Sequence, residues 1–541
     1  MSLRENKFIV AALVFTIVFS GLTFGNLPGL ETALGSQTID NVVYNFADYP
    51  SLNHEQIALF NYMRGLITTE EVNSSDNWNA GGFSGLLHYM FAFTDYVLSS
   101  YFETIPGYRT DHYLNTTRTL IKKMNTTVAE YGNSSIEYLE WESRGYPDYY
   151  WPNATNPNDL FVGGFRGPTN IMWTGHYALM QALYERCFNT GEFVDELTWF
   201  VEDWNNSLTT DGYGNAAEGG IWGTGLIPCE PYIVFAQCNS IPIFATELYD
   251  SMYDTQYMES GMWDYGLNFI NTVMHEEYDL FIDGYYVQLP IGYTGSMGSG
   301  TVLTVPGPAV SRGFDDGRAA ESSYCTAWTL TFLEYTQPER SIEDYPLFLE
   351  KYGVEVSGEQ MYMSGSFNDY GSFGSPNDML GSFFTCTLAK QRGDYLTVQR
   401  LQNFLTSPYN KVWSADGREM HYDTTSLSPF LQPVMAGFRI WATTPVTIPD
   451  LADARPIGFW NYPYISQADD EDIWVYQALW DDDNSAFILN IKVDQTATLT
   501  LSNFDHAPTA YSGGVPLSEL VAAGSDYVLT LSPGIYNLVI L

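Results

Sequence analysis

The sequence predicts a mainly α fold, in which six helical hairpins form a barrel that is followed by a C-terminal β-sandwich. Apolar residues recur with helical spacing in paired segments as far as residue 443. Three prolines between residues 445 and 456 then interrupt the chain, and short alternating segments follow. We expect a hydrophobic N-terminal segment over residues 1–27, the barrel over 45–445 and the sandwich over 457–541.

The composition supports a folded, acidic protein. Among 541 residues, 45% are hydrophobic and 16% are aromatic, which is enough apolar surface to form a large core and excludes a mainly disordered chain. The 64 acidic residues outnumber the 22 basic ones, so the formal net charge is −42. Such a charge repels phosphate backbones, and we therefore expect no nucleic-acid partner.

The first residues predict export from the cytoplasm. Arg4 and Lys7 precede an apolar run from Phe8 to Phe24. A short positive flank before such a run is typical of a secretory signal peptide or of an uncleaved membrane anchor, and both alternatives stay open. We expect membrane contact only through this segment, with the body of the protein secreted or held at the extracellular or periplasmic face. Six N-glycosylation sequons agree with an exterior location: Asn73, Asn115, Asn125, Asn133, Asn153 and Asn205.

The helical segments alternate between two compositions. In each pair the second segment is the more apolar, so we assign the second segments to the inner ring of the barrel. Long Gly-, Pro- and Asn-rich connections, such as residues 144–169, 209–229 and 284–317, are expected to shape a site at the mouth of the barrel. The predicted pairs are 54–68 with 84–103, 111–131 with 170–187, 192–208 with 230–253, 258–276 with 318–336, 342–352 with 376–392, and 396–407 with 425–443.

The C-terminal segments predict an antiparallel sandwich that supports the barrel or binds a partner, without chemistry of its own. Five stretches have strand composition and are separated by turn residues: DIWVYQALW, AFILNIKV, ATLTLSNF, DYVLTLS and IYNLVIL.

Two of the five cysteines form a candidate catalytic pair. Cys229 and Cys238 bracket the stretch CEPYIVFAQCNS, with Cys229 just before a predicted helix and Cys238 two to three turns into it. A helix N-terminus favours a thiolate and apolar surroundings favour a thiol, so the pair would offer a base and an acid. The alternative is a disulfide, which requires Cys229 to fold back from the loop because nine helical positions span about 13 Å. Cys187, Cys325 and Cys386 lie singly in apolar helical runs and are interpreted as packing residues.

His176 is a candidate general acid or base. It follows Met172 by four residues, so both side chains lie on one helical face. A hydrogen-bonded core histidine is the alternative. HExxH, CxxC, Walker and GxGxxG motifs are absent from the sequence, and we expect neither a metal site nor a cofactor. Carboxylate pairs of glycosidases have no characteristic spacing, so a carbohydrate-active site stays open.

Several sequence blocks together resemble the linalool dehydratase-isomerase family. The specific part is NIMWTGHYALMQALYE together with CEPYIVFAQCNSIPIF, and the resemblance covers roughly residues 170–445. It implies an (α/α)6 barrel, in agreement with the hairpin count. Further blocks agree in order: YCTAWTL at 324–330, the helix at 377–394, HYD at 421–423 and VMAGFRIW at 434–441.

The resemblance also implies a cofactor-free reaction in which water leaves an allylic alcohol or returns to the other end of the allyl unit. It places the catalytic groups on Cys229, Cys238 and His176. An aspartate and a tyrosine of the family have no equivalent, because Arg64 and Glu70 stand at the aligned places. The substrate-binding residues that we expect are Met172, Trp173, Phe235, Gln237 and Tyr324, with Tyr177 and Trp328 as further rings that would stabilise an allyl cation.

Three function classes follow from the sequence. The first is an exported hydro-lyase or isomerase that acts on a small apolar allylic alcohol. The second is a polysaccharide lyase or glycosidase on the same barrel, with aromatic side chains stacked on sugar rings. The third is a non-catalytic surface protein, and association into a homo-oligomer stays open for each class.

Overall fold

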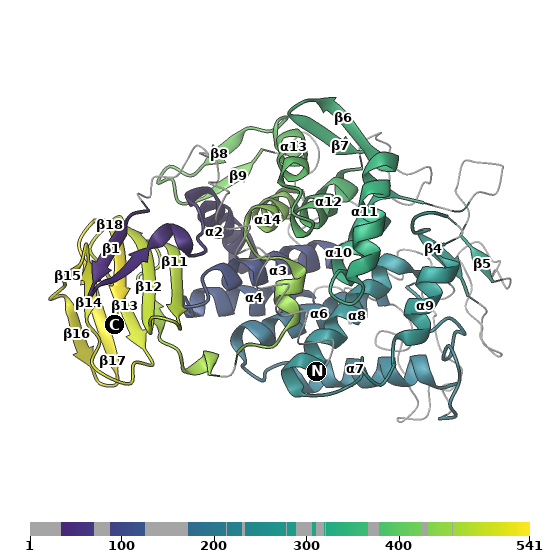
Figure 1. The fold of residues 1–541 in the computed structure, drawn as a ribbon, viewed down its shortest axis with the longest axis horizontal. Coiled ribbons are helices and arrows are strands. Elements are labelled where there is room, and N and C mark those ends of the chain that lie inside the picture. Colours follow the sequence, from purple (N-terminus) through teal and green to yellow (C-terminus); the bar gives the residue numbers. More distant parts are fainter. Residues whose placement is uncertain are drawn as a thin grey trace.

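The protein is mostly helical, with a separate β-rich C-terminal region, as Figure 1 shows. In Figure 1 the C-terminal strands, in yellow, lie at one end of the molecule and the helices fill the rest. The computed structural model describes residues 34–69, 87–124, 171–211, 214–229, 233–276, 278–287, 306–309, 319, 321–365, 378–423, 431–456 and 458–541. The predicted signal or anchor, Glu70 and four of the six sequons lie outside these residues.

Six apolar helices pack against one another in a closed cycle. Each contacts the next in chain order, and the last contacts the first. Their side chains are buried almost all round, as in α6, where 17 of 18 residues are buried. The six helices are α3 (Leu87–Thr104), α6 (Ile171–Phe188), α8 (Ala236–Tyr253), α10 (Ser323–Leu333), α12 (Met379–Gln391) and α14 (Leu431–Thr443).

A second set of helices packs outside this cycle and has only one buried face. In α4, for example, the buried residues recur every three to four positions while Lys122 and Lys123 stay outside. The helices alternate in the chain with those of the cycle, which confirms the predicted pairs. They are α2 (His54–Thr69), α4 (Asp111–Met124), α7 (Val194–Thr209), α9 (Asp264–Val273), α11 (Pro338–Tyr352) and α13 (Tyr395–Thr406); a short α15 (Ile448–Ala452) follows.

Short strands lie in the connections between helices. Strand β3 (Ile233–Phe235) pairs with β4 (Gly284–Tyr286), which pairs with β5 (Gly307–Pro308). The other connections hold two antiparallel hairpins: β6 (Gly353–Ser357) with β7 (Gln360–Met363), and β8 (Lys411–Trp413) with β9 (Met420–Tyr422).

The C-terminal region has two antiparallel sheets. The stretches predicted as strands correspond to β11, β12, β13, β17 and β18. The four-stranded sheet has the order β10 (Tyr464–Ala468), β13 (Ala497–Ser502), β17 (Asp526–Leu531), β16 (Leu520–Ala523). The five-stranded sheet has the order β11 (Ile473–Asp481), β12 (Ala486–Val493), β18 (Gly534–Ile540), β14 (Ala510–Ser512), β15 (Val515–Pro516).

An N-terminal hairpin covers part of the five-stranded sheet. Strands β1 (Ser36–Ile39) and β2 (Val42–Asn45) pair with each other and precede the predicted start of the barrel. Ile39 and Tyr44 of this hairpin form an apolar cluster with Ile488 and Val539. This cluster explains why β12 is buried on both faces, which its continuous apolar sequence AFILNI indicates.

The helical and β-rich parts are joined by direct backbone contact at Gly107. Its N–H donates to the carbonyl of Ala478 at 2.8 Å, and its carbonyl accepts from the N–H of Ile465 at 2.8 Å. A Cβ at this position would lie 2.5 Å from Cε2 of Phe487. Only glycine permits such a close approach between the two parts.

Among the described residues, no helix combines the length and hydrophobicity needed to span a bilayer.

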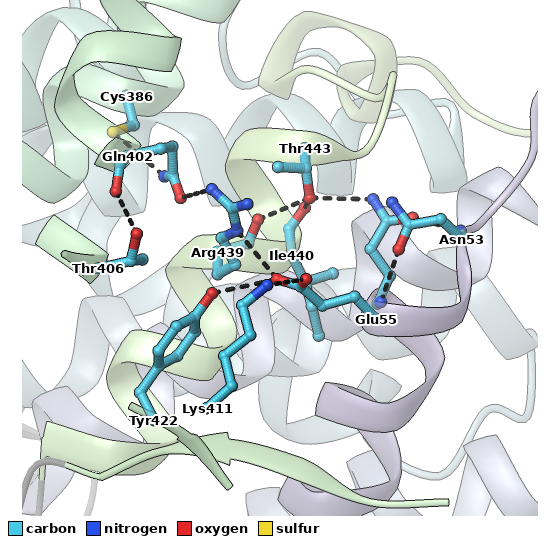
Figure 2. A network of polar contacts seen from close by, with 11 residues as sticks. Asn53, Glu55, Cys386, Gln402, Thr406, Lys411, Tyr422, Arg439, Ile440 and Thr443 are labelled. Atoms are coloured by element: carbon cyan, nitrogen blue, oxygen red, sulfur yellow. Dashed lines mark hydrogen bonds and ion pairs between the residues drawn. The ribbon is translucent and has the colours of Figure 1, made fainter. Parts of the chain in front are cut away.

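A network of polar contacts fixes α14 to its neighbours (Figure 2). Glu55 of α2 accepts from Lys411 and from the Tyr422 hydroxyl, and pairs with Arg439 of α14 at 3.4 Å. Arg439 also donates to Gln402 of α13 at 2.6 Å. The neighbouring cations hold the pKa of Glu55 below its usual value despite burial. The network ties α2, α13, α14 and the β8–β9 hairpin together.

Candidate active site

The candidate residues gather near the N-terminal ends of the inner helices. Met172 and His176 lie in the first turns of α6, Cys238 is the third residue of α8, and Tyr324 is the second residue of α10. From α3, Tyr89 reaches across to α6, where its hydroxyl lies 3.7 Å from the Met172 sulfur. The structure therefore brings side chains from four inner helices to the same end of the cycle.

His176 is surrounded by aromatic rings. The side chain is fully buried, and the Tyr89 ring meets its imidazole edge-on at 5.2 Å between centroids. Phe93 approaches at 5.8 Å and Trp328 at 5.3 Å. Because aromatic walls exclude water and offer negative ring faces, this environment suits a reaction that passes through a carbocation.

Tyr96 contacts His176. The Tyr96 hydroxyl forms a hydrogen bond with Nδ1 of His176. Burial raises the pKa of Tyr96 well above its usual value, and negative charge at Asp95 and Cys238 adds to the rise. A phenol with so high a pKa stays protonated, which keeps it available as a donor to the imidazole.

The helix around Cys238 begins later than the sequence predicts. Residues 233–235 form β3, whose Phe235 pairs with Gly284, and α8 begins only at Ala236. Cys238 consequently lies in the first turn of α8, and the prediction that it lies two to three turns into the helix is wrong. The cause is strand pairing with β4, which holds these residues extended. In this position Cys238, rather than Cys229, is at the helix end that favours negative charge.

Cys229 is held in a loop that Asn239 fastens to α8. The Asn239 side chain accepts from the N–H of Ile227 at 2.9 Å and donates to the carbonyls of Ile227 and Phe235, both at 3.0 Å. The neighbouring carbonyl of Pro228 accepts from the first residue of α6. Cys229 is buried, and neither Cys229 nor Cys238 forms a disulfide.

Gln237 and Cys325 form a contact beside Cys238. The Cys325 thiol donates to Oε1 of Gln237 at 3.1 Å. Burial raises the pKa of Cys325 well above its usual value, and Asp283 and Cys238 contribute to the rise. The Tyr324 pKa is raised by burial and by the same neighbours. Gln237, the residue before Cys238, is thereby joined to α10.

Two capping residues set the position of Tyr324. Ser322 caps α10 by accepting from the N–H of Cys325 at 3.2 Å. Asp378 caps α12 and also accepts from Ser323 at 2.6 Å and from the N–H of Tyr324 at 3.0 Å. These bonds join the first turns of two inner helices at the site.

Trp173 and Tyr177 contact each other and an outer helix. Trp173 stacks on Tyr177 at 4.7 Å, and the Tyr177 hydroxyl donates to Glu196 of α7. The Tyr177 ring also meets Phe200 of α7 edge-on at 6.0 Å.

Arg64 acts electrostatically on His112 and on Asp470, at the junction with the β-rich region. It therefore does not stand beside His176 in place of the aspartate or tyrosine that the family uses.

One family model matches part of the chain. Residues 88–304 match the family model of linalool dehydratase/isomerase. The match supports an enzyme of the lyase or isomerase kind. Its segment includes Met172, His176, Cys229 and Cys238, together with all the residues of α3 that surround the imidazole.

Solved structures are similar only at low identity. One is the GH76A alpha-1,6-mannanase from Salegentibacter sp. HEL1_6, with 9% identity, a TM-score of 0.39, and coverage of 74% of this chain and 98% of that chain. An inactive variant of that mannanase in complex with alpha-1,6-mannotriose gives 10% identity, a TM-score of 0.38, and coverage of 74% and 97%.

Sequence reasoning missed Tyr89, Phe93, Tyr96 and the contact of Cys325. The first three have helical spacing within YMFAFTDY. This row of aromatic residues on the more apolar helix of a pair could have indicated that they share one face of that helix. Cys325 was interpreted as packing, although it bonds Gln237 of the linalool dehydratase/isomerase segment. Among the described residues, no three His, Cys, Asp or Glu side chains are arranged to hold a metal ion.

Proposed function

We propose that the protein is a cofactor-free hydro-lyase or isomerase that acts on a small apolar allylic alcohol. The observation that carries the proposal is the Tyr96 hydroxyl, which contacts a buried His176 imidazole that is surrounded by aromatic rings. The family match over residues 88–304 supports the same class of reaction.

In this reaction the thiols and the imidazole act as acid and base. Cys229 donates a proton to the substrate hydroxyl, the C–O bond breaks, and water leaves. The Cys238 thiolate, favoured by its place in the first turn of α8, removes a proton from the neighbouring carbon to form the new double bond. After these steps Cys229 is a thiolate and Cys238 is a thiol. His176 then carries the proton from Cys238 back to Cys229, which restores the starting state. For isomerisation, water instead adds at the far end of the allyl unit.

The aromatic rings around His176 would stabilise the positive charge that forms in this reaction. Loss of water leaves positive charge spread over the allyl unit, and the faces of Trp328, Phe93 and Tyr89 would stabilise that charge while they exclude bulk water. Tyr96 orients the imidazole, because a phenol that donates to Nδ1 leaves the proton of neutral His176 on Nε2.

The proposal also includes the barrel, the β-sandwich and export of the protein. The closed cycle of inner helices with an outer helix set supports an (α/α)6 barrel, and two packed antiparallel sheets support a β-sandwich. Export of the protein, by a signal peptide or an anchor over residues 1–27, is proposed from the sequence alone.

The proposal is tested with terpene and short-chain alkenols, whose products are followed by gas chromatography. Cys229→Ala and Cys238→Ala should each reduce turnover by at least 10³-fold, because each removes a proton donor or acceptor. Cys386→Ala is the matched control: this free thiol is buried in α12 but contacts Gln402 at 3.3 Å, away from the site. It should keep turnover within about threefold of the unchanged protein.

Turnover that survives both alanine replacements would contradict the thiol mechanism. Reaction in water labelled with oxygen-18 gives a second readout, since water that adds to the allyl unit leaves its oxygen in the alcohol product. Hydrolysis of polysaccharides, without any change in the alkenols, would instead support the carbohydrate-active alternative.

A further inference from the structure

Helix α8 contains a proline in its interior, one turn after Cys238. This residue, Pro242, is buried. A proline inside a helix lacks the N–H that would bond to the carbonyl four residues earlier, and its ring crowds that carbonyl. The carbonyl that loses its helical donor here is that of Cys238. A residue that disrupts helices therefore acts directly on the residue that carries the candidate thiol.

Side-chain bonds hold the first turn of α8 in place. The Ser240 hydroxyl donates to the carbonyl of Gln237 at 2.7 Å, and the Cys325 thiol of α10 donates to the Gln237 side chain at 3.1 Å. Side chains thus support the turn in which Pro242 removes a backbone bond. The position of Cys238 consequently depends on the elements that pack against this turn.

The Pro242 ring packs against α6 at Gly175. A Cβ added to Gly175 would lie 3.0 Å from Cδ and 3.6 Å from Cγ of this ring. A Cβ contact of 3.0 Å is too tight for the two helices to keep their positions, so glycine permits the approach that the structure shows. Helices α6 and α8 therefore meet through a glycine and a proline ring.

This contact lies next to both candidate groups. Gly175 directly precedes His176 in α6. Cys238 lies four residues before Pro242, so the two share one face of α8, and that face meets α6 at Gly175. The separation of the two helices at this point therefore affects how near the thiol of Cys238 lies to the imidazole of His176.

Helix stability does not explain either residue. Glycine and proline are the two residues that least favour the interior of a helix. Both stand in buried stretches of inner helices, where alanine would favour the helix more. Departures from local preference of this kind are expected where the arrangement serves a functional site.

We propose that Gly175 and Pro242 are positioning residues, which set the spacing between the helix of His176 and the helix of Cys238. The inference rests on the proposed function, in which the imidazole and the thiol serve one substrate. A displacement of about 1 Å in such an arrangement can reduce the rate about 100-fold. Both residues act through the helix backbones and take no part in proton transfer.

Turnover of the alkenols by two single variants tests the positioning. Pro242→Ala restores the N–H and removes the two ring carbons nearest Gly175, while Gly175→Ala adds the Cβ that meets the ring. We expect kcat to fall at least about tenfold in each, with KM changed less than about threefold, because the reacting groups are displaced. The midpoint of thermal unfolding should fall by less than about 5 °C, since the gain in helix preference offsets the change in packing.

Matched controls carry the same exchanges elsewhere in the protein. Pro346→Ala alters an exposed proline inside α11, and Gly437→Ala adds a Cβ 3.2 Å from Val97 where α14 meets α3. Both should keep kcat within about threefold of the unchanged protein.

The double variant Gly175→Ala/Pro242→Ala tests whether the two residues act through one contact. The new Cβ enters the space that the ring leaves, so kcat should exceed that of either single variant at least about threefold. Losses that simply multiply in the double variant would overturn the proposal.

A thiol readout separates this inference from the proposed function. The rate at which methyl methanethiosulfonate modifies Cys238, followed by peptide mass spectrometry, depends on the surroundings of the thiol and not on turnover. We expect this rate to change at least about threefold in Pro242→Ala and in Gly175→Ala, and to stay the same in Pro346→Ala. Cys187, near the other end of α6, is the internal reference.

The two readouts together decide between the possible failures. If the unchanged protein turns over no alkenol but the rate at Cys238 responds to the variants, the proposed function fails and the positioning stands. An unchanged kcat in both single variants, or an unchanged rate at Cys238 where turnover is absent, would overturn the positioning.

Discussion

The two ends of the inner helices differ in the charge that they carry. Near the N-terminal end of α6, His176 lies among aromatic rings, whereas Arg186 in the last turn of the same helix bonds to Glu103 and to backbone carbonyls. Lys390 in the last turn of α12 likewise donates to the carbonyls of Thr444 and Val446. Helix dipoles favour this arrangement, since cations stabilise C-terminal ends and leave N-terminal ends suited to developing negative charge.

The comparison teaches that one set of helices can carry unlike groups at its two ends. Where the side chains are neutral and aromatic, water is excluded. At the other end, fixed cations bond to Glu103 and to backbone carbonyls. The three changes below test how far these two ends depend on the residues that distinguish them.

The largest effect is expected for Asn239→Ala at the N-terminal end. It leaves the N–H and carbonyl of Ile227 and the carbonyl of Phe235 without their side-chain partner, all in a buried position. We expect the free energy of unfolding to fall by about 3 kcal/mol, since each buried group costs about 1 kcal/mol or more. Urea unfolding measures the change, and turnover should fall with it because Cys229 loses its support.

Asn403→Ala is the control for this change. Its side-chain amide also donates to a backbone carbonyl, that of Glu359, but in an exposed position. It should cost less than about 0.5 kcal/mol. A similar cost for both variants would show that the Asn239 contacts do not hold the loop.

Tyr96→Phe should reduce activity more than stability. The change removes the hydroxyl that contacts Nδ1 of His176 and leaves the ring in place. We expect kcat to fall 10- to 100-fold, equivalent to about 1.4–2.7 kcal/mol in the barrier, because the imidazole loses its orientation. The pH dependence of kcat should also change, which loss of packing alone would not cause.

Tyr101→Phe serves as its control on the same helix. The Tyr101 ring stacks on Phe60 of α2 at 4.5 Å and is directed away from His176. It should leave kcat within about twofold. An unchanged kcat and pH profile in Tyr96→Phe would remove Tyr96 from the proposed proton pathway.

Much of the fold could be predicted from the sequence because its periodicity is strong. The six helix pairs and the principal strands agree with the structure to within a few residues in most cases. The clearest error is the predicted start of α8. Residues 233–235 form β3 because they pair with β4, some 50 residues away, and the local sequence does not indicate such a distant pairing. The β1–β2 hairpin was missed for a related reason, since its apolar residues are buried only against β12 and β18.

The candidate site was predictable only in part. Met172 and His176 follow from helical spacing, and the thiols were found from their paired position and a family resemblance. Tyr96 could be assigned only when α3 was placed beside α6.

The smallest effect, taken per pH unit, concerns Lys390, a buried cation at the C-terminal end of α12. Burial lowers its pKa from 10.5 to about 7, although Asp450 and Cys386 partly oppose the shift. Between these two values the unfolded chain binds a proton that the folded protein does not. The free energy of unfolding should therefore rise with pH from about 7 to about 10, by at most about 1.4 kcal/mol per pH unit.

Lys390→Met removes this titration. Urea unfolding at pH 6, 7, 8 and 9 gives the free energy of unfolding of both proteins. The contribution of Lys390 is the difference between their slopes against pH. The variant should show a flatter rise above pH 7 and the same slope as the unchanged protein below pH 6.5. Lys122→Met, at an exposed lysine that pairs with Glu192, should change neither slope. Parallel curves for Lys390→Met and the unchanged protein up to pH 9 would mean that Lys390 keeps its proton when buried. The C-terminal end of the cycle would then hold a permanent ammonium ion, whose burial is compensated by the carbonyls at the end of α14.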